Sequence, residues 1–249
     1  GLTILSLAGS LTFANGQSKD NLKIENIYLT SCVNGNPCTD KSKDVLLKDK
    51  VNLNLVVEAI EDGNKKYFSE SKEVELNNKK INVSDIKDLE GLNYNIKWFK
   101  VEPQNVNYNN WGTAGFQWDT PTYTETPIDS SKWAIKADAF STDKWTIKKT
   151  QGLGTMRYKV EFSEGKERFS TEGKNSKDKE GIKENVHRIS FRKDDSFLGW
   201  LTSYFNVPYI YGNSEKQAEE YLGVDCADLL IASYRKMGYA FPYTSVSGL

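Results

Sequence analysis

Apolar side chains recur at every second position in the longest regular stretches between residues 22 and 193. Residues 51–57 and 156–162 alternate apolar and polar side chains, and residues 94–103 form a β-branched and aromatic run that ends at a proline. A period of two is the pattern of a β-strand with one buried face. Shorter strand-like segments lie at 22–29, 65–69, 72–77, 132–140 and 144–150. Many short strands at this spacing predict an antiparallel β-sandwich-like domain over residues 20–193, with Trp98 buried on a central strand.

The periodicity changes to that of a helix after Asp195. Apolar residues then recur at steps of three and four, and Ser196 stands where a helix N-cap is expected. The segment just before, residues 170–185, has one apolar residue in sixteen, which indicates a long exposed loop or a linker. The sequence therefore predicts an α+β fold, with a domain boundary between residues 170 and 195 and a second, initially helical domain over 196–249.

The charge balance limits the class of partner. The chain of 249 residues carries 33 Lys and Arg against 34 Asp and Glu, a formal net charge of −1. Binding to nucleic acid needs a clustered surplus of basic residues, so this balance argues against it. Hydrophobic residues make up 38% of the chain, including 12% aromatics, which is enough to build a sizeable core. With one histidine and three cysteines, the sequence indicates no metal site and no cofactor.

The first residues resemble a targeting segment. Residues 2–14 are apolar or small throughout, and the first charged residue is Lys19. This stretch is too short to span a bilayer, but it has the pattern of the hydrophobic part of a secretory signal. We interpret residues 1–16 as a signal peptide remnant; the alternative is a buried first strand. The interpretation as a signal peptide predicts a secreted or cell-envelope protein with no membrane span in the mature chain.

Cys32 and Cys38 enclose the turn-forming sequence VNGNP. Asn-Gly and Asn-Pro favour tight reversals, so in an exported chain the two cysteines predict a local disulfide. The alternative, half of a metal site, is not completed by a second Cys or His pair. This pairing leaves Cys226 as the odd thiol of the chain.

Cys226 lies in the stretch GVDCADLL, residues 223–230. If Asp225 caps a helix, Cys226 becomes its first residue, where unpaired backbone N–H groups favour the thiolate and can donate to an oxyanion. A cysteine acyl-transfer enzyme needs this arrangement. The neighbouring Asp225 carboxylate disfavours the thiolate unless its charge is engaged by backbone donors. The alternative is a small thiol that only fills a helix interface.

The surrounding segments carry a resemblance that favours the nucleophile. In order, they read FLGWLTSYFNVPYIYGN, GVDCADLLIASYRKMGY and AFPYTS, over roughly residues 197–247. This stretch resembles the start of the NlpC-type (NlpC/P-sixty) cell-wall peptidases, a papain-like family of cysteine endopeptidases. The resemblance implies that Cys226 is the nucleophile, that the hydroxyl of Tyr209 faces the reacting centre, and that Asp225 flanks the nucleophile.

Several positions depart from the family pattern. Asn213 stands where a second glycine is usual, Asp228 where glycine is common, and Tyr243 where an arginine follows the proline. The family also places its catalytic histidine some tens of residues after the cysteine, and no histidine follows Cys226. We therefore expect a sequence truncated before the base and its orienting residue. The full-length protein would then be the active peptidase, and this chain alone would be inactive.

The single histidine, His187, fits a structural position better than a catalytic one. Its alternation with Ile189 and Phe191 places it on one face of a strand, so we predict a half-buried sheet histidine and not a base.

The resemblance implies hydrolysis of amide bonds in the stem peptides of peptidoglycan. Aromatic side chains at Trp111, Trp118 and Tyr211 are candidates for substrate binding, because tyrosine and tryptophan rings can stack on sugars; the alternative is that the tryptophans pin a loop to the sandwich. Two other functions stay open: a non-catalytic wall-binding or adhesion protein with an incomplete peptidase domain, and a lipid- or amine-transferring relative. The sequence leaves the oligomeric state undetermined.

Overall fold

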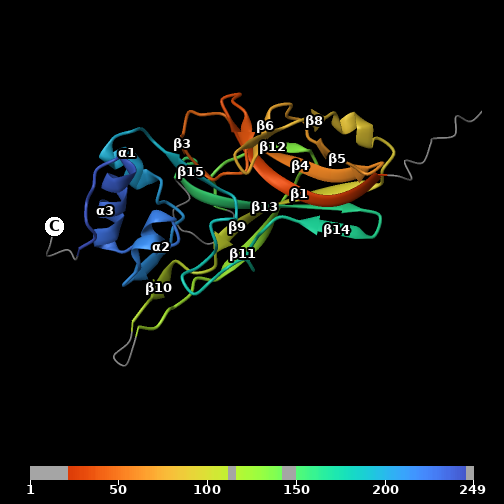
Figure 1. Ribbon diagram of the computed structural model, residues 1–249. Helices are drawn as coiled ribbons and strands as arrows, with labels where there is room; N and C mark the ends of the chain where they lie inside the picture. Colours follow the sequence, from red (N-terminus) through yellow and green to blue (C-terminus); the bar gives the residue numbers. More distant parts are fainter. Residues whose placement is uncertain (1–21, 112–115, 142–149, 245–249) are drawn as a thin grey trace, which may run out of the picture.

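The computed structural model describes residues 22–111, 116–141 and 150–244. The predicted signal remnant at 1–16 and nearly all of the strand candidate at 144–150 lie outside the described residues. What is described is dominated by β-strands, with short helices near its C-terminal end (Figure 1). This agrees with the β-rich α+β fold expected from the sequence.

One sheet has eight strands in the order β7-β6-β2-β1-β4-β5-β8, with β12 also pairing with β4. Its centre is the long antiparallel pair of β1 (Leu22–Val33) and β4 (Val51–Glu61), which runs from Leu22 opposite Glu61 to Val33 opposite Val51. The remaining strands are β2 (Cys38–Thr39), β5 (Asn64–Phe68), β6 (Val74–Leu76), β7 (Lys79–Ile81), β8 (Val83–Ser84) and β12 (Ala134–Lys136), with a 3-10 helix η1 at Ile86–Leu89.

The second sheet has six strands in the order β11-β9-β13-β15-β3, with β14 pairing with β13. These strands are β3 (Lys43–Leu46), β9 (Tyr94–Pro103), β11 (Tyr123–Ile128), β13 (Gly154–Glu164), β14 (Glu167–Ser170) and β15 (Arg188–Arg192). Most neighbours are antiparallel, and the edge pair β15–β3 is parallel.

The two sheets pack on one hydrophobic core. Residues from β1 and β4 on one side meet residues from β9 and β13 on the other. Trp98 on β9 is fully buried in this core, and its indole N–H donates to the carbonyl of Lys132 at 2.8 Å. The sandwich explains why apolar and polar residues alternate in the sequence, because one face of each strand packs against the opposite sheet.

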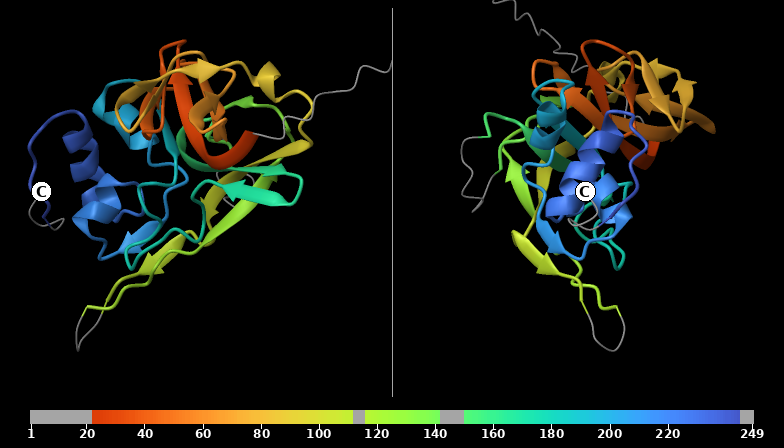
Figure 2. Two further views of the ribbon diagram at one scale, coloured as in Figure 1. Left: turned by 45° about the vertical axis from the view of Figure 1, so that its right-hand side comes forward. Right: turned by 90° about the vertical axis from the view of Figure 1, so that its left-hand side faces the viewer.

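Short helices gather at one end of the sandwich (Figures 1 and 2). They are α1 (Phe197–Thr202), α2 (Glu215–Glu219) and α3 (Cys226–Lys236), capped by the side chains of Ser196, Ser214 and Asp225 respectively. Between α1 and α2, β16 (Tyr209–Tyr211) pairs in parallel with β10 (Asn107–Asn109), which extends from the sandwich. The helical end is therefore tied to a segment that lies about one hundred residues earlier in the chain.

Polar contacts fasten the helical end to the second sheet. The backbone N–H of Thr155 donates to the carbonyl of Phe205 at 2.8 Å. Gly154 makes this approach possible: its φ is +113°, and a Cβ there would lie 2.5 Å from the Phe205 carbonyl oxygen. Arg157, which is buried, donates from Nη2 to the carbonyl oxygens of Glu220 at 2.7 Å and Tyr221 at 3.1 Å.

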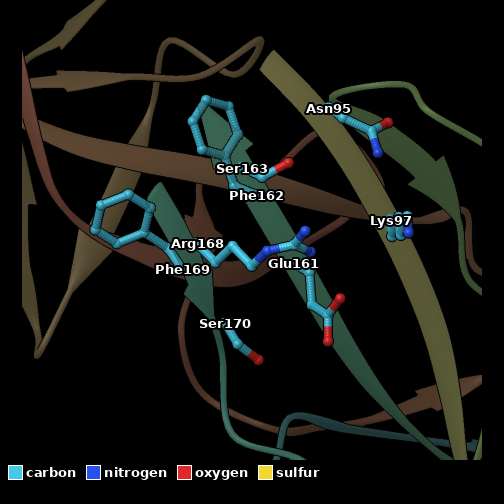
Figure 3. A pocket seen from close by; sticks show the side chains of 8 residues that line it. All are labelled: Asn95, Lys97, Glu161, Phe162, Ser163, Arg168, Phe169 and Ser170. Atoms are coloured by element: carbon cyan, nitrogen blue, oxygen red, sulfur yellow. The ribbon is translucent and has the colours of Figure 1, made fainter. Parts of the chain in front are cut away.

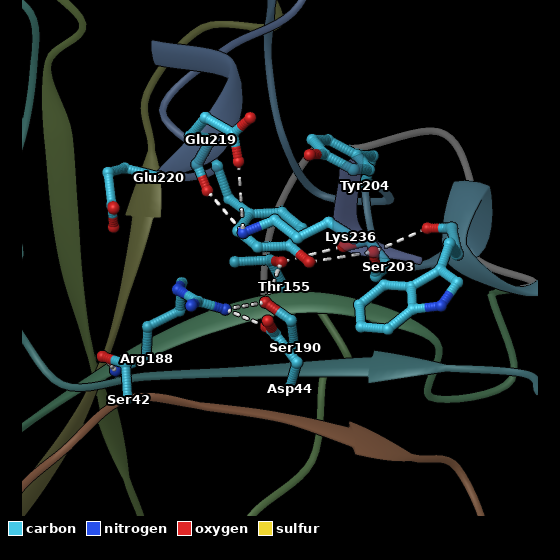
Figure 4. Close-up of polar contacts among 12 residues, drawn as sticks. Ser42, Asp44, Thr155, Arg188, Ser190, Ser203, Tyr204, Glu219, Glu220 and Lys236 are labelled. Carbon is cyan, nitrogen blue, oxygen red and sulfur yellow. Dashed lines mark hydrogen bonds and ion pairs between the residues drawn. The ribbon is translucent and has the colours of Figure 1, made fainter. Parts of the chain in front are cut away.

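A second group of polar contacts, around Arg188 and Thr155, also joins the helical end to the second sheet (Figure 4). The Arg188 guanidinium bonds to Asp44 at 2.6 Å and lies 4.4 Å from the centre of the Tyr221 ring. Burial is the largest influence and acts to raise the pKa of Asp44, but the hydrogen bond from Arg188 and the charges of Arg188, Lys236 and Arg192 together lower that pKa. The Thr155 hydroxyl reaches Ser190 at 2.5 Å and donates to the carbonyl of Ser203 at 2.8 Å.

Residues 170–185 form a loop that contacts the helical end. Ile182 is buried in a small apolar cluster with Leu222, and Lys216 of α2 forms ion pairs with Asp178 at 3.0 Å and Glu180 at 2.9 Å. The sandwich and the helical end therefore touch along this loop.

The predicted disulfide is present between Cys32 of β1 and Cys38 of β2. Cys38 is fully buried and packs with Val56 and Val74, so the bridge joins the turn to the first sheet. No helix in the described part of the chain is long and apolar enough to cross a membrane.

Candidate functional site

The N-terminus of α3 carries the candidate nucleophile. Asp225 has an extended backbone, and its carboxylate accepts from the backbone N–H of Asp228 at 2.9 Å, as an N-cap does. Cys226 is the first helical residue, and its thiol is free and exposed. The local prediction of cap and first helical residue is confirmed. Because one carboxylate oxygen is occupied by the cap bond, part of its charge is directed at the helix backbone.

Tyr209 is brought to this helix start by the backbone. Ile210 donates from its N–H to the carbonyl of Val224 at 3.1 Å, and Val224 donates to the carbonyl of Pro208 at 3.1 Å. Tyr209 therefore forms a parallel bridge with Val224, two residues before Cys226. Partial burial, the Asp225 carboxylate and Cys226 together raise the pKa of Tyr209, which is consistent with the three side chains being neighbours.

Gly223 allows this arrangement. A Cβ at this position would lie 2.1 Å from the Cδ1 atom of Ile210, inside any permitted contact. The glycine of the GVDC stretch is thus needed for packing, because it lets the segment leading into α3 lie directly on β16.

Two departures from the family pattern contact each other. The Asn213 side chain accepts from the N–H of Asp225 at 2.9 Å and donates to Asp228 Oδ2 at 2.8 Å. Asn213 therefore holds both the cap residue and the first turn of the helix. Burial and the charge of Asp225 raise the pKa of Asp228 to about 6, although the Asn213 hydrogen bond acts in the opposite direction. A carboxyl that titrates near neutral pH thus lies in the same helical turn as the thiol.

The N-terminus of α3 also has backbone N–H groups that can donate hydrogen bonds. The N–H groups of Asp228 and Leu229 bond to Asp225, whereas those of Cys226 and Ala227 have no partner among the described residues. Free N–H groups beside an exposed thiol are the donors that a tetrahedral oxyanion requires. The arrangement can therefore hold a carbonyl group against the sulfur.

His187 lies elsewhere and is unsuited to act as a base. It is buried rather than half-buried, one residue before β15, and burial lowers its pKa to about 4 while Asp40 acts in the opposite direction. It lines a groove of about 600 Å³ with residues of β1 and with Asp40, and neither Tyr209 nor Cys226 lines that groove. Among the described residues, no group of three or more His, Cys, Asp and Glu side chains could hold a metal ion.

The aromatic candidates divide into two groups. Tyr211 is 60% exposed on β16, the strand that also carries Tyr209, and Trp111 is 55% exposed two residues after the end of β10. Trp118 is half-buried, with the Phe116 ring packed edge-on against it at 4.9 Å and the Lys179 ammonium 5.3 Å from its ring centre. Tyr211 and Trp111 therefore keep free ring surface, while Trp118 is engaged by its neighbours.

Sequence reasoning missed the residues that join the two regions. Asn110, nearly fully buried, donates to Gln217 Oε1 of α2 at 2.9 Å and accepts from the N–H of Asp119 at 2.9 Å. Asn107 and Asn109 lie directly opposite Tyr209 and Tyr211. The only signal in the sequence is the clustering of asparagines in NVNYNNW, residues 105–111, which resembles an ordinary loop.

A separate pocket of about 310 Å³ lies on the outer face of the second sheet (Figure 3). It is lined by residues of β9, β13 and β14, including Lys97, Glu161 and Arg168, and contains neither cysteine nor histidine. On β9, its residues Asn95 and Lys97 alternate with buried Ile96 and Trp98. The pocket is therefore a feature of the solvated sheet face and does not include the thiol.

Comparison with protein-family models found no match, and neither the curated proteins nor the solved structures gave a significant match.

Proposed function

We propose that this protein is a secreted or cell-envelope cysteine peptidase that hydrolyses amide bonds in peptidoglycan stem peptides, with Cys226 as its nucleophile. The observation that carries the proposal is the exposed thiol at the N-terminus of α3, with free N–H groups and Tyr209 beside it. The papain-like relationship and the substrate come from the resemblance of residues 197–247 to the NlpC-type family. The Cys32–Cys38 disulfide is typical of an exported protein and supports the location.

The proposed reaction is acyl transfer through the thiol. The Cys226 sulfur attacks the amide carbonyl carbon, its proton passes to a base, and the oxyanion is held by the helix N–H groups. The C–N bond then breaks as the amine leaves with a proton, and water hydrolyses the thioester to regenerate the thiol. The described residues place no suitable base beside Cys226, since His187 is buried in a different part of the sandwich. The proposal therefore assigns the base to none of the described residues.

The same observation favours one alternative. A thiol without a neighbouring base is what a non-catalytic wall-binding protein with an incomplete peptidase domain would also have. The two functions differ in whether Cys226 forms a covalent bond with substrate. A labelling experiment can therefore separate them without requiring turnover.

The test compares covalent capture of two electrophiles by the full chain. A stem-peptide chloromethyl ketone should label Cys226 faster, relative to simple iodoacetamide, than it labels free cysteine, because the site holds the peptide against the sulfur. Cys226→Ala should abolish labelling. Leu230→Ala, a partly exposed position on the same helix, should leave it unchanged.

Hydrolysis is measured on purified cell wall. Release of muropeptides should be lost in Cys226→Ala and kept in Leu230→Ala. Equal release by Cys226→Ala and wild type would remove Cys226 from the mechanism. Labelling of Cys226 by the peptide electrophile no faster than that of free cysteine would favour the non-catalytic alternative.

A further inference from the structure

The strand pair β10–β16 presents a face whose side chains come from two distant parts of the chain. Asn107 lies opposite Tyr209 and Asn109 opposite Tyr211, and residues paired in this way point to the same side of a sheet. Trp111 follows Asn109 by two residues and continues the alternation. We call these five residues, Asn107, Asn109, Trp111, Tyr209 and Tyr211, the aromatic–amide face.

The aromatic–amide face is exposed, while the residues between its members are buried. Tyr209, Tyr211 and Trp111 are 42%, 60% and 55% exposed, whereas Tyr108 and Ile210 are 5% and 0% exposed. The side-chain amides of Asn107 and Asn109 make no hydrogen bond with the described residues. The face therefore combines open ring surface with free donors and acceptors.

The face rests on a fixed support. Asn110 donates from its backbone N–H to the carbonyl of Tyr211 at 3.0 Å and from its side chain to Gln217, and the Tyr108 hydroxyl donates to the carbonyl of Thr122 at 3.2 Å. A surface held in place before binding loses little conformational freedom when a ligand arrives. The backbone that carries the exposed rings is thus held in place before a ligand binds.

The chemistry of the face selects a class of ligand. None of its five residues is charged, so it lacks the basic side chains that bind phosphates or anionic lipid surfaces. Tyrosine and tryptophan rings offer flat apolar surface, and amides offer paired donors and acceptors. A sugar ring has the complementary combination of a C–H face and a rim of hydroxyl groups. Alternate residues on a strand are about 7 Å apart, which lets rings at Tyr209 and Tyr211 contact neighbouring parts of such a chain.

We infer that the aromatic–amide face binds a neutral glycan chain, with the bound chain lying next to Cys226. Tyr209 belongs to both the face and the thiol site, so a glycan lying on the face would bring an attached peptide to the helix start. The glycan site deepens the proposed function by naming the sugar component of its substrate. Its binding does not require the thiol, so the two proposals can fail separately.

The experiment measures binding of a soluble tetramer of N-acetylglucosamine to the full chain, by tryptophan fluorescence and by calorimetry. Wild type should bind the tetramer, and Tyr211→Ala and Trp111→Ala should each weaken binding by about tenfold or more, as loss of a stacking ring does. Tyr239→Ala is the matched control, because Tyr239 is also 60% exposed but lies beyond α3. It should bind as wild type does.

Asn109→Ala should weaken binding without changing the fold, as judged by circular dichroism. Cys226→Ala should bind the tetramer normally, which distinguishes this proposal from the nucleophile. The inference is overturned if wild type does not bind the tetramer, if Tyr239→Ala loses as much affinity as Tyr211→Ala, or if only a sugar-free stem peptide binds.

Discussion

Asp228 places a titratable charge in the first turn of α3. Its carboxyl accepts from Asn213, and its backbone N–H donates to Asp225, so it belongs to the same hydrogen-bonded turn as Cys226. Burial and the Asp225 charge raise its pKa to about 6, and the carboxylate therefore forms as the pH rises through that value. Above that pH, Asp228 adds a negative charge to the helical turn that carries Cys226.

Asp228→Asn should therefore speed alkylation of Cys226 at pH 7 to 8 by roughly two- to fivefold, the effect of one nearby charge in partly solvated surroundings. The amide oxygen of asparagine can still accept from Asn213, so the turn should persist. The gain should disappear below about pH 5, where Asp228 is already neutral in the wild type. Iodoacetamide rates followed by mass spectrometry give the measurement.

Glu167→Gln is the control for this prediction, because it removes one exposed carboxylate on β14 of the sandwich and leaves the turn of Asp228 unchanged. Its alkylation rate should match that of wild type. A rate for Asp228→Asn equal to that of wild type across the pH range would show that the charge of Asp228 does not reach the thiol.

His187 makes the folded state sensitive to acid. Its pKa is about 4 in the folded protein, below the value near 6.5 of an unfolded chain, because burial disfavours the charged ring. Between these values the unfolded state binds a proton that the folded state does not. The stability contribution is therefore complete above about pH 6.5 and is lost as the pH falls towards 4.

His187→Phe should remove this dependence. We expect the free energy of unfolding of wild type to fall by on the order of 3 kcal/mol more than that of the variant between pH 7 and 4. Urea unfolding at several pH values measures the difference. Parallel pH profiles for the two proteins would mean that His187 is protonated as easily in the fold as in the unfolded chain.

At the scale of elements, the segment leading into α3 depends on its contact with β16. A side chain at residue 223 would overlap Ile210, so Gly223→Ala should destabilise the protein by about 1–3 kcal/mol through overpacking. Thermal unfolding measures this loss. If the overlap is the cause, Ile210→Ala and Gly223→Ala combined should cost less than the sum of the single changes. Strict additivity would contradict the proposed contact.

The link between β1 and β2 is covalent. The Cys32–Cys38 bridge closes a short loop whose second cysteine is buried in the first sheet. Replacing both cysteines by serine should reduce the free energy of unfolding by roughly 2 kcal/mol in the chain-entropy description of so short a loop. Denaturant unfolding of the double variant, with and without reductant, tests this value. A reductant should destabilise the wild type and leave the variant unaffected.

Across the whole molecule, buried cations couple the sandwich to the helical end. Burial lowers the pKa of Arg157 to about 10, and its guanidinium satisfies the carbonyl oxygens of Glu220 and Tyr221 just beyond α2. Arg157→Met would leave these carbonyls buried without a donor, which should cost about 2–4 kcal/mol. The loss should be largest at the helical end, because the two carbonyl oxygens that lose their donor lie just beyond α2.

Hydrogen exchange followed by mass spectrometry checks this prediction. Peptides that contain α2 and α3 should lose protection in Arg157→Met, while peptides from β1 and β4 should change much less. Arg168→Met, on the exposed strand β14, is the matched control and should leave exchange unchanged. Uniform loss of protection in Arg157→Met would show that the two regions open only as one unit.

The sequence by itself determined the features that depend on local pattern. Period-two alternation predicted β4 and β13, a β-branched and aromatic run predicted β9, and local pattern predicted the Asp225 cap with Cys226 as first helical residue, because each signal lies within a few residues. The disulfide followed from turn chemistry between two nearby cysteines.

Only the tertiary structure decided what lies beside the thiol. β10 and β16 are each three residues long and lie about one hundred residues apart in the chain. Neither strand therefore has a sequence pattern from which its pairing partner could be predicted. His187 likewise lines a groove with residues of β1 and with Asp40, which lie far away in the chain. Pairing between such short, distant strands is set by the packing of the sheets and helices around them, which no local sequence signal records.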